Sequence, residues 1–265
     1  KRFKMNIGIF QGRLSDSDIL QKFPSNWQQE FFTAKVLGYS HIEIFLEEKI
    51  NKQNPFWNKK EREKIKKKIL TLDNKKIILC DNFVIRNDLY QQSTLKYLNK
   101  IINILCEFNN PKLIIPIDKN YFKDIDKLSK FLNNLSLLSK NKGVELSYEI
   151  DAKYNSVLSL FKKLKFDNVG ITFDAGNIFL SHKNLIQYFR KIYKHINHIH
   201  IKDRNIRGEN VILGTGLINF LTLFKEIKYR KYSGDVTLET FRKKNSIIQA
   251  HKNLHFLKSL YKKRY

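Results

Sequence analysis

The sequence predicts a single (β/α)8 barrel domain formed by all 265 residues. Short apolar runs alternate with helical patterns through the whole chain, at intervals of roughly 25 to 40 residues, as in a barrel of eight strands and eight helices. No linker rich in Pro, Gly or Ser divides the chain into two domains. Several apolar runs also end in charged or imidazole side chains, which is typical of the carboxyl ends of barrel strands.

The predicted strands are short runs rich in Ile, Leu, Val and Phe that stop at polar or turn residues. They cover residues 5–10, 41–46, 76–80, 112–116, 144–150, 169–173, the stretch 197–204 with the Ile residues around it, and 235–238. In the stretch 197–204, polar and apolar residues alternate before imidazole, ammonium, carboxylate and guanidinium groups follow one another. This alternation predicts a strand whose end emerges into a cleft.

The predicted helices lie between these strands. Ser25 and Gln28 have the spacing of a capping box, which predicts a helix that begins there and ends at Gly38. The following helices are expected over residues 59–72, 94–108, 124–140, 156–164, 183–194 and 218–227. Apolar residues from Ile247 to Tyr261 then recur at spacings of three and four, so the last helix has one face that can pack on the barrel.

An open doubly wound sheet is the main alternative fold. It would need a Gly-rich turn of the form G-x-G-x-x-G after its first strand. Here the first strand is followed by Gln11-Gly12-Arg13, which does not have this form. The barrel is therefore the favoured architecture.

The composition is strongly basic, with 50 Lys and Arg against 25 Asp and Glu and a formal net charge of +25. Such a charge can indicate a nucleic acid, an anionic membrane or a phosphorylated substrate. The basic residues are mostly Lys and occur in every predicted helix, so we interpret them as a solvated surface, with steering of an anionic substrate as the alternative. We expect a small-molecule sugar or sugar phosphate as partner, no membrane or nucleic acid, and leave a homo-oligomer open.

The sequence gives no sign of a membrane or secreted protein. No apolar run approaches the ~20 residues of a membrane-spanning helix, and the first residues do not lead into the apolar core of a signal peptide. We expect a cytoplasmic protein in which residues 1–4 are a tag or an extension before Met5. Cys80 and Cys106 have no metal-type spacing and are both expected to be buried thiols.

Four consecutive predicted strands end in a side chain of the metal-binding type. These are Glu149, Asp174, His200 and Glu239, each directly after an apolar run. Adjacent strand ends lie about 5 Å apart, so the four side chains would converge. Three close carboxylates repel one another unless a cation lies among them. The pattern predicts a site for one divalent ion, and its oxygen-rich ligands suit Mn²⁺, Mg²⁺, Co²⁺ or Fe²⁺ better than structural zinc.

The sequence also resembles the sugar phosphate isomerases and epimerases of the xylose isomerase-like TIM barrel superfamily. The matching segments, in the family's order, are Gln11-Gly12-Arg13, Glu43 within residues 41–44, Tyr148-Glu149, Phe173 to Asn177, His198 to Asp203, Leu213 to Gly216, and Thr237 to Glu239. They span nearly the whole chain. As an ordered set they indicate the superfamily but not the substrate.

The resemblance implies that Glu149, Asp174, His200 and Glu239 hold one divalent metal ion, with Mn²⁺ preferred and Mg²⁺, Co²⁺, Fe²⁺ or Zn²⁺ as alternatives. It implies that Glu149 and Glu239 are the catalytic acid and base on opposite faces of the substrate. A proton moved through an enediolate would then isomerise or epimerise a sugar or a sugar phosphate.

Other polar residues near the strand ends are expected to bind the substrate: Gln11, Arg13, Glu43, Asp81, Asn177, Lys202 and Arg204. Arg13, Lys202 and Arg204 could hold a phosphate or carboxylate group, or instead form salt bridges within the protein. Glu43 and Asp81 are expected to contact sugar hydroxyls.

Several alternatives stay open at this point. Several ketose epimerases of the superfamily have a His three positions after the metal-binding Asp, and Asn177 stands at that position here, which argues against that particular reaction. A dehydratase would use the same proton abstraction and then expel a hydroxyl. An abasic-site endonuclease-like, nucleic-acid-binding protein would need three zinc ions and more histidines, but His182, His195, His251 and His255 fall on predicted helices or helix ends. A barrel without catalytic activity is the last alternative.

Overall fold

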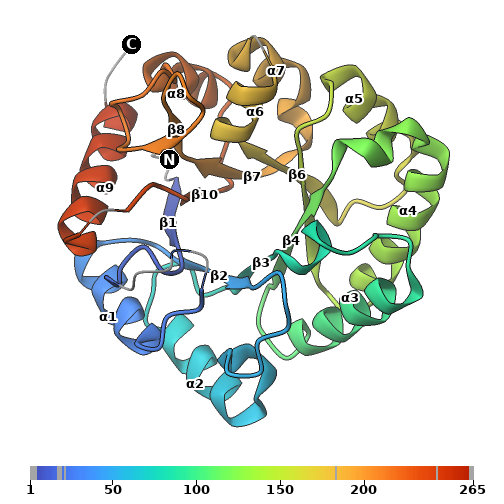
Figure 1. Cartoon of the computed structure of the whole chain (residues 1–265), viewed down its shortest axis with the longest axis horizontal. Coiled ribbons are helices and arrows are strands. Elements are labelled where there is room, and N and C mark those ends of the chain that lie inside the picture. The colour runs from blue at the N-terminus through green and yellow to red at the C-terminus, as the bar shows by residue number, and fades with distance from the viewer. Residues whose placement is uncertain (1–4, 17–19, 21, 183, 243, 263–265) are drawn as a thin grey trace.

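The computed structural model describes residues 5–16, 20, 22–182, 184–242 and 244–262, and these form a closed barrel surrounded by helices (Figure 1). Residues 1–4, for which a tag or extension was expected, lie outside the described residues. The barrel strands are β1 (Asn6–Phe10), β2 (Ile42–Leu46), β3 (Ile78–Asp81), β4 (Lys112–Ile117), β5 (Glu145–Ile150), β6 (Val169–Asp174), β7 (Ile196–Ile201) and β10 (Asp235–Leu238). They are all parallel, and β10 lies between β7 and β1, which closes the barrel. The predicted (β/α)8 architecture is therefore confirmed.

Helices cover the outside of the barrel, as expected (Figure 1). They are α1 (Trp27–Leu37), α2 (Lys59–Ile69), α3 (Gln92–Leu105), α4 (Ile125–Asn141), α5 (Tyr154–Lys163), α6 (Ala175–Ser181), α7 (Leu185–Ile192), α8 (Phe220–Tyr229) and α9 (Ser246–Lys262). A short antiparallel ribbon, β8 (Asp203–Arg204) and β9 (Asn210–Val211), follows β7. None of the described helices is both long and apolar enough to cross a membrane.

Two local predictions were wrong, and one helix was missed. Ser25 does not cap α1, because the helix begins after Asn26 without a side-chain cap, and in its first turns Trp27 packs on Phe31. The helix α6 was not predicted, although the Asp174 side chain accepts a hydrogen bond from the backbone N–H of Asn177 at 2.8 Å and so caps it. Cys106 is exposed, since it lies just after the last buried turn of α3, whereas Cys80 is buried as expected.

An apolar cluster on β1 to β4 contrasts with the many polar side chains of β5 to β10, although Glu43 on β2 and Lys112 on β4 are buried too. Phe10, Phe45, Ile78, Cys80 and Ile114, all from β1 to β4, form a small apolar cluster separate from the larger core. In β5 to β10, by contrast, many interior side chains are polar, such as Ser147 and Thr172, whose hydroxyls lie 2.6 Å apart on adjacent strands. This division places the reactive groups on β5, β6, β7 and β10 against an apolar wall.

Candidate active site

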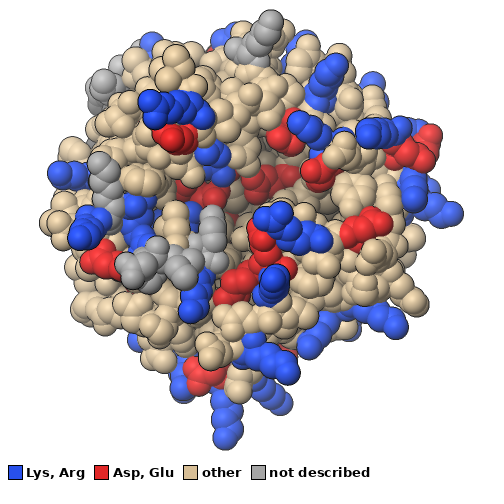
Figure 2. Space-filling view, viewed as in Figure 1, with Lys and Arg blue, Asp and Glu red and all other residues tan. Residues whose placement is uncertain are grey.

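A cavity of about 560 Å³ opens at the carboxyl ends of the strands. Figure 2 shows this face of the molecule, where acidic side chains gather in the central hollow while most Lys and Arg lie at the periphery. Glu149, Asn177, Lys202 and Glu239 line the cavity, and Phe10 forms part of its apolar wall. A smaller adjoining cavity of about 290 Å³ shares Glu149 and Asn177 with it. The cavity therefore lies where the sequence placed the reactive strand ends.

The four predicted metal ligands converge on one point. The Nδ1 atom of His200 lies 3.5 Å from Glu239 Oε2, 3.7 Å from Glu149 Oε2 and 3.7 Å from Asp174 Oδ2. The strand register explains this, because Asp174 on β6 is opposite His200 on β7, and Glu239 directly follows β10, which pairs with β7. Within the described part of the chain, His200 Nδ1 is buried and has no hydrogen-bond partner.

The three carboxylates are not equivalent electrostatically. Burial, together with the charge of Asp174, raises the pKa of Glu149 to about 7. Burial acts in the same direction on Asp174, but the charges of Lys202 and His200 hold the pKa of this carboxyl below its usual value. Burial alone would lower the pKa of His200, whereas the charge of Glu43 and nearby acids raise it well above its usual value. Positive charge is thus strongly favoured between these acids.

Lys202 supplies part of that positive charge. Its Nζ lies 2.7 Å from Asp174 Oδ2 and 2.9 Å from Glu239 Oε2. Burial opposes its charged form, but Asp174 and Glu239 raise the pKa of this ammonium above its usual value. Lys202 therefore forms salt bridges within the protein, the alternative to substrate binding, and its partners are two predicted metal ligands.

Two further predicted residues hold other side chains in the cavity wall. Asn177 donates a hydrogen bond from Nδ2 to Glu149 Oε1 at 2.7 Å and accepts one from Arg204 Nη2 at 3.0 Å. The buried Arg13 donates from Nε to the carbonyl oxygen of Thr240 at 3.3 Å, and its Nη2 lies 3.9 Å from Glu239 Oε1. The guanidinium groups of Arg13 and Arg204 therefore already have partners within the protein.

The remaining predicted substrate-binding residues, Gln11, Asp81 and Glu43, are buried and do not line the larger cavity. Neither side-chain amide atom of Gln11 has a hydrogen-bond partner in the described structure. Asp81 accepts a hydrogen bond from the Tyr97 hydroxyl at 2.9 Å, and burial raises the pKa of this carboxyl to about 7. Direct contact with the sugar stays a prediction for these three residues.

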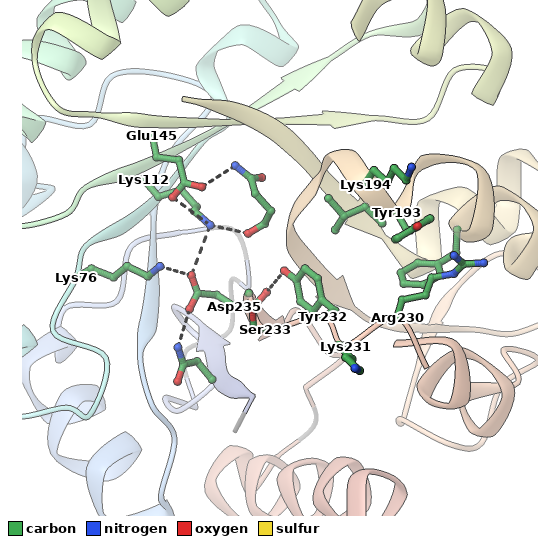
Figure 3. Close-up of a pocket in the computed structure, with 15 residues that line it drawn as sticks. Lys76, Lys112, Glu145, Tyr193, Lys194, Arg230, Lys231, Tyr232, Ser233 and Asp235 are labelled. Atoms are coloured by element: carbon green, nitrogen blue, oxygen red, sulfur yellow. Dashed lines mark hydrogen bonds and ion pairs between the residues drawn. The ribbon is translucent and has the colours of Figure 1, made fainter. Parts of the chain in front are cut away.

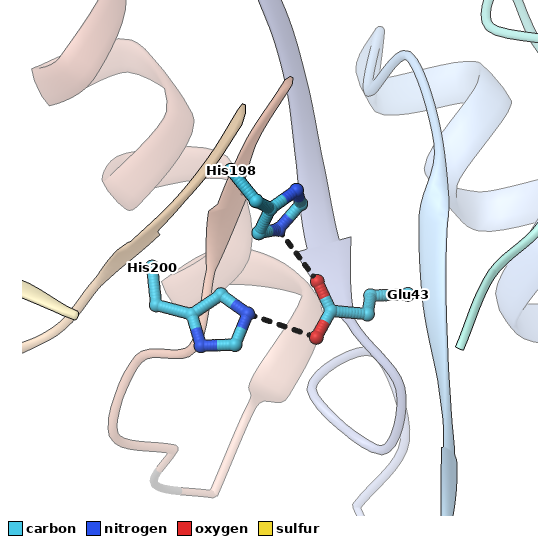
Figure 4. Close-up of side chains that lie close together, drawn as sticks. All are labelled: Glu43, His198 and His200. Carbon is cyan, nitrogen blue, oxygen red and sulfur yellow. Dashed lines mark hydrogen bonds and ion pairs between the residues drawn. The ribbon is translucent and has the colours of Figure 1, made fainter. Parts of the chain in front are cut away.

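Glu43 instead lies in the barrel interior, where its carboxylate meets the rings of His198 and His200 (Figure 4). One oxygen accepts a hydrogen bond from His200 Nε2 and the other from His198 Nε2, both at 2.9 Å. His198 was not among the predicted site residues, although the alternation in His198-Ile199-His200 places both rings on the same side of β7. Two groups could therefore hold a metal ion, one with Glu149, Asp174 and His200, the other with Glu43, His198 and His200.

The fold and these residues agree with a family assignment. Residues 31–260 match the model of the xylose isomerase-like TIM barrel family. The chain belongs to this family.

Two curated proteins illustrate the range of relatives. The chain is 23% identical over 282 residues to the putative L-ribulose-5-phosphate 3-epimerase SgbU of Haemophilus influenzae. This alignment covers 94% of this chain and 95% of that protein. It is 25% identical over 142 residues to the uncharacterized protein MJ1311 of Methanocaldococcus jannaschii, covering 49% of this chain and 48% of that protein. The second match thus spans about half the length of the relative.

Solved structures share the fold across the whole chain. D-psicose 3-epimerase of Clostridium cellulolyticum H10, solved with D-tagatose, has a TM-score of 0.76 at 13% identity, covering 97% of this chain and 99% of that chain. An L-ribulose 3-epimerase has a TM-score of 0.77 at 14% identity, with coverages of 97% and 95%. The IOLI protein, solved with a zinc atom, has a TM-score of 0.75 at 17% identity, with coverages of 98% and 100%.

Proposed function

We propose that this chain is an enzyme of the isomerase class that isomerises or epimerises a sugar, using one divalent metal ion bound by Glu149, Asp174, His200 and Glu239. The observation that carries the proposal is the buried His200 Nδ1, which lacks a hydrogen-bond partner in the described structure and lies 3.5 to 3.7 Å from three carboxylates. The names of the relatives support it. SgbU is named as a putative sugar-phosphate epimerase, and two of the structural neighbours above are named as sugar epimerases.

The donor set fits a divalent ion. Lys202 pairs with Asp174 and Glu239, and Arg13 lies 3.9 Å from Glu239, so the three carboxylates together with Glu43 outnumber the Lys and Arg side chains beside them. Oxygen ligands with one imidazole suit Mn²⁺, Mg²⁺, Co²⁺ or Fe²⁺, and Zn²⁺ stays an alternative. When bound, such an ion supplies Lewis-acid polarisation of a sugar carbonyl and its neighbouring hydroxyl. We take Mn²⁺ as the first ion to test.

Glu149 and Glu239 are proposed as the acid and base that move the proton through an enediolate. They come from β5 and from the end of β10, with the β6 and β7 ends between them, so they flank the space where a substrate would lie. The contact from Asn177 Nδ2 holds one oxygen of Glu149, and Lys202 Nζ holds one oxygen of Glu239. Glu149 Oε2 and Glu239 Oε2 face His200 Nδ1, at 3.7 and 3.5 Å. These contacts fix the orientation of both carboxylates, as acid–base catalysis requires.

The substrate is proposed to be an unphosphorylated sugar. The loop after the β8–β9 ribbon contains Gly214 and Gly216, whose backbone N–H groups resemble a phosphate-binding turn. Both instead donate to Asp203 Oδ2, at 2.9 and 2.8 Å, so an internal carboxylate already occupies them. Arg204 and Lys202 are engaged as well. Among the described residues that line the cavity, Lys49 is the remaining cation, beside the acids Glu47 and Glu48.

The nuclease alternative has less support. A three-zinc site would need further histidines near the mouth, but His182 Nε2 donates a hydrogen bond to the carbonyl oxygen of Asp151 and His195 packs on Phe161. His251 and His255 lie on α9 and are exposed. The described histidines other than His198 and His200 therefore do not extend the acidic cluster towards a second and third metal.

Proton exchange with solvent tests the proposal. A panel of free ketoses and aldoses, each beside its phosphate ester, is incubated in D₂O with the Mn²⁺-loaded protein and followed by NMR. We expect deuterium at a carbon of one free sugar, with formation of an epimer or isomer and no loss of water. Release of a dehydrated product would indicate the dehydratase, and preference for the ester would contradict the proposed substrate class. No exchange with any sugar would contradict the isomerase.

A further inference from the structure

We propose that Glu43 and His198 are positioning residues that fix the imidazole of His200 so that its Nδ1, and not its Nε2, faces the metal ion. The inference rests on the metal site of the proposed function and extends it to two residues that do not touch the cavity. All three side chains are fully buried, with exposed fractions of 0%. Figure 4 shows the two rings pointing at opposite oxygens of one carboxylate.

The hydrogen-bond chemistry determines which ring nitrogens carry hydrogen. An ionised carboxylate only accepts hydrogen bonds, so each imidazole 2.9 Å away must donate from Nε2. In a neutral His200 with its hydrogen on Nε2, the lone pair is on Nδ1, which faces Glu149, Asp174 and Glu239.

His198 contributes by holding the second oxygen of Glu43. Without it, the carboxylate could turn about its last bonds and lose its alignment with His200. His198 Nε2 is also 3.0 Å from Thr237 Oγ1, and the same hydroxyl is 3.0 Å from His41 Nε2. We call Glu43, His198 and His200 the clamp. Thr237 on β10 and His41, just before β2, therefore hold the clamp in place through these polar contacts.

Packing around the clamp supports a fixed geometry. The ring of Phe10 meets His200 edge-on, with 6.1 Å between ring centroids. At Gly8 on β1, a Cβ atom would lie 2.1 Å from His41 Nε2, so only glycine leaves room for the ring that braces Thr237. Both contacts restrict rotation of the buried rings, and a restricted ring presents the same nitrogen to the cavity.

A metal ion inside the clamp is the competing interpretation, because Glu43, His198 and His200 are themselves close enough to share one. The 2.9 Å contacts have the length of N–H···O hydrogen bonds. An ion there would need both Nε2 atoms without hydrogen, and His200 would then turn its protonated Nδ1 towards the acids. The two interpretations thus predict opposite nitrogens of His200 as the ligand.

The test combines metal affinity with the identity of the bound nitrogen. In Glu43→Gln, one acceptor becomes an N–H donor, so one of the two imidazoles must change its protonated nitrogen or lose its bond. We expect Zn²⁺ affinity, measured by calorimetry on the full chain, to fall about 10- to 100-fold, the usual effect of losing such a partner. In the Zn²⁺-loaded native protein, ¹⁵N NMR should show hydrogen on Nε2 of His200 and metal on Nδ1.

A matched pair at His198 separates positioning from general packing and does not require that Glu43→Gln folds. His198→Gln keeps an N–H donor at a similar reach and should bind Zn²⁺ nearly as well as the native chain. His198→Leu removes the donor and should bind about tenfold more weakly.

Three results would overturn the inference: native Zn²⁺ affinity in Glu43→Gln, equal affinities in the two His198 variants, or metal on Nε2 of His200. Failure of the proposed function looks different. If Zn²⁺ binds through Nδ1 and responds to Glu43, but no sugar exchanges deuterium, the positioning role stands and the reaction assignment fails.

Discussion

The two ends of the barrel both bury charged residues, but only one end leaves them incompletely paired. At the amino end, beside a cavity of about 410 Å³, Asp235 Oδ2 lies 2.5 Å from Lys76 Nζ and 3.5 Å from Lys112 Nζ. Lys112 also donates to the carbonyl oxygen of Asn197 at 2.6 Å and lies 3.5 Å from Glu145 (Figure 3). At the carboxyl end, Lys202 pairs with Asp174 and Glu239 and Arg13 with Glu239, whereas Glu149 has no Lys or Arg partner among the described residues and His200 Nδ1 lacks a hydrogen-bond partner there.

This contrast separates charges that serve stability from charges that serve binding. A paired network at the amino end needs no ligand, and the amino end of a barrel typically contributes stability. An excess of acids at the carboxyl end is unfavourable by itself and becomes favourable when a cation binds. At the carboxyl end, burial raises the pKa of Glu149 to about 7, while Lys202 and His200 outweigh burial and lower the pKa of Asp174. At the amino end, the charges of His41, Lys112 and Lys76 outweigh burial and lower the pKa of Asp235.

The largest effect is expected from Glu239→Gln. The amide keeps the shape of the side chain but cannot take up or return a proton, so the rate of deuterium exchange should fall by about 10²- to 10⁴-fold. NMR of the sugar measures this rate. Glu145→Gln, at the amino end, is the matched control and should exchange at the native rate. Equal rates in the native chain and Glu239→Gln would remove the assigned role of Glu239.

The next effect concerns stability and belongs to the amino end. Lys112→Met leaves Asp235 and Glu145 with less positive charge in a buried setting, which should lower the free energy of unfolding by about 3 kcal/mol. Urea unfolding followed by circular dichroism measures it. The folded fraction should keep its metal content and exchange rate. A stable variant with lost metal binding would contradict the division between the two ends.

A smaller effect should appear as a pH dependence at Asp81. Burial raises its folded pKa to about 7, above the usual value of 3.8, so the folded chain keeps a proton that the unfolded chain has released. The resulting loss of stability develops as pH rises from about 4 to about 7 and is complete above that range. Between pH 5 and pH 7, native stability should therefore fall relative to Asp81→Asn by on the order of 2 kcal/mol. A constant difference across this range in urea unfolding would contradict the raised pKa.

The smallest effect is expected from Asn177→Ala. The change removes the hydrogen bond that holds Glu149 Oε1, worth about 1 to 2 kcal/mol to a charged acceptor, so exchange should slow by about tenfold. Metal content should stay unchanged, since Asn177 is not a proposed ligand. Asn197→Ala, whose side chain binds Glu145 at the amino end, should lower stability but not the exchange rate. The opposite pattern would mean that Asn177 has only a structural role.

The sequence was sufficient to predict the fold and the convergence of four strand ends, because strand periodicity and the parallel barrel determine both locally. Partners across the barrel interior were harder to predict. Glu43 on β2 reaches His198 and His200 on β7, 155 and 157 residues away, and no local pattern indicates which interior side chains meet. Lys202 was predicted near the site but not as the partner of Asp174 and Glu239, since its direction depends on side-chain torsions beyond the strand pattern.

Metal content tests the central claim most directly. The native chain is stripped of metal, reloaded with Mn²⁺, freed of excess ion by gel filtration and measured by plasma mass spectrometry beside His200→Ala. The account predicts one Mn²⁺ per native chain and close to none in the variant. An empty native chain, three zinc ions per chain, or equal metal in the two proteins would contradict it.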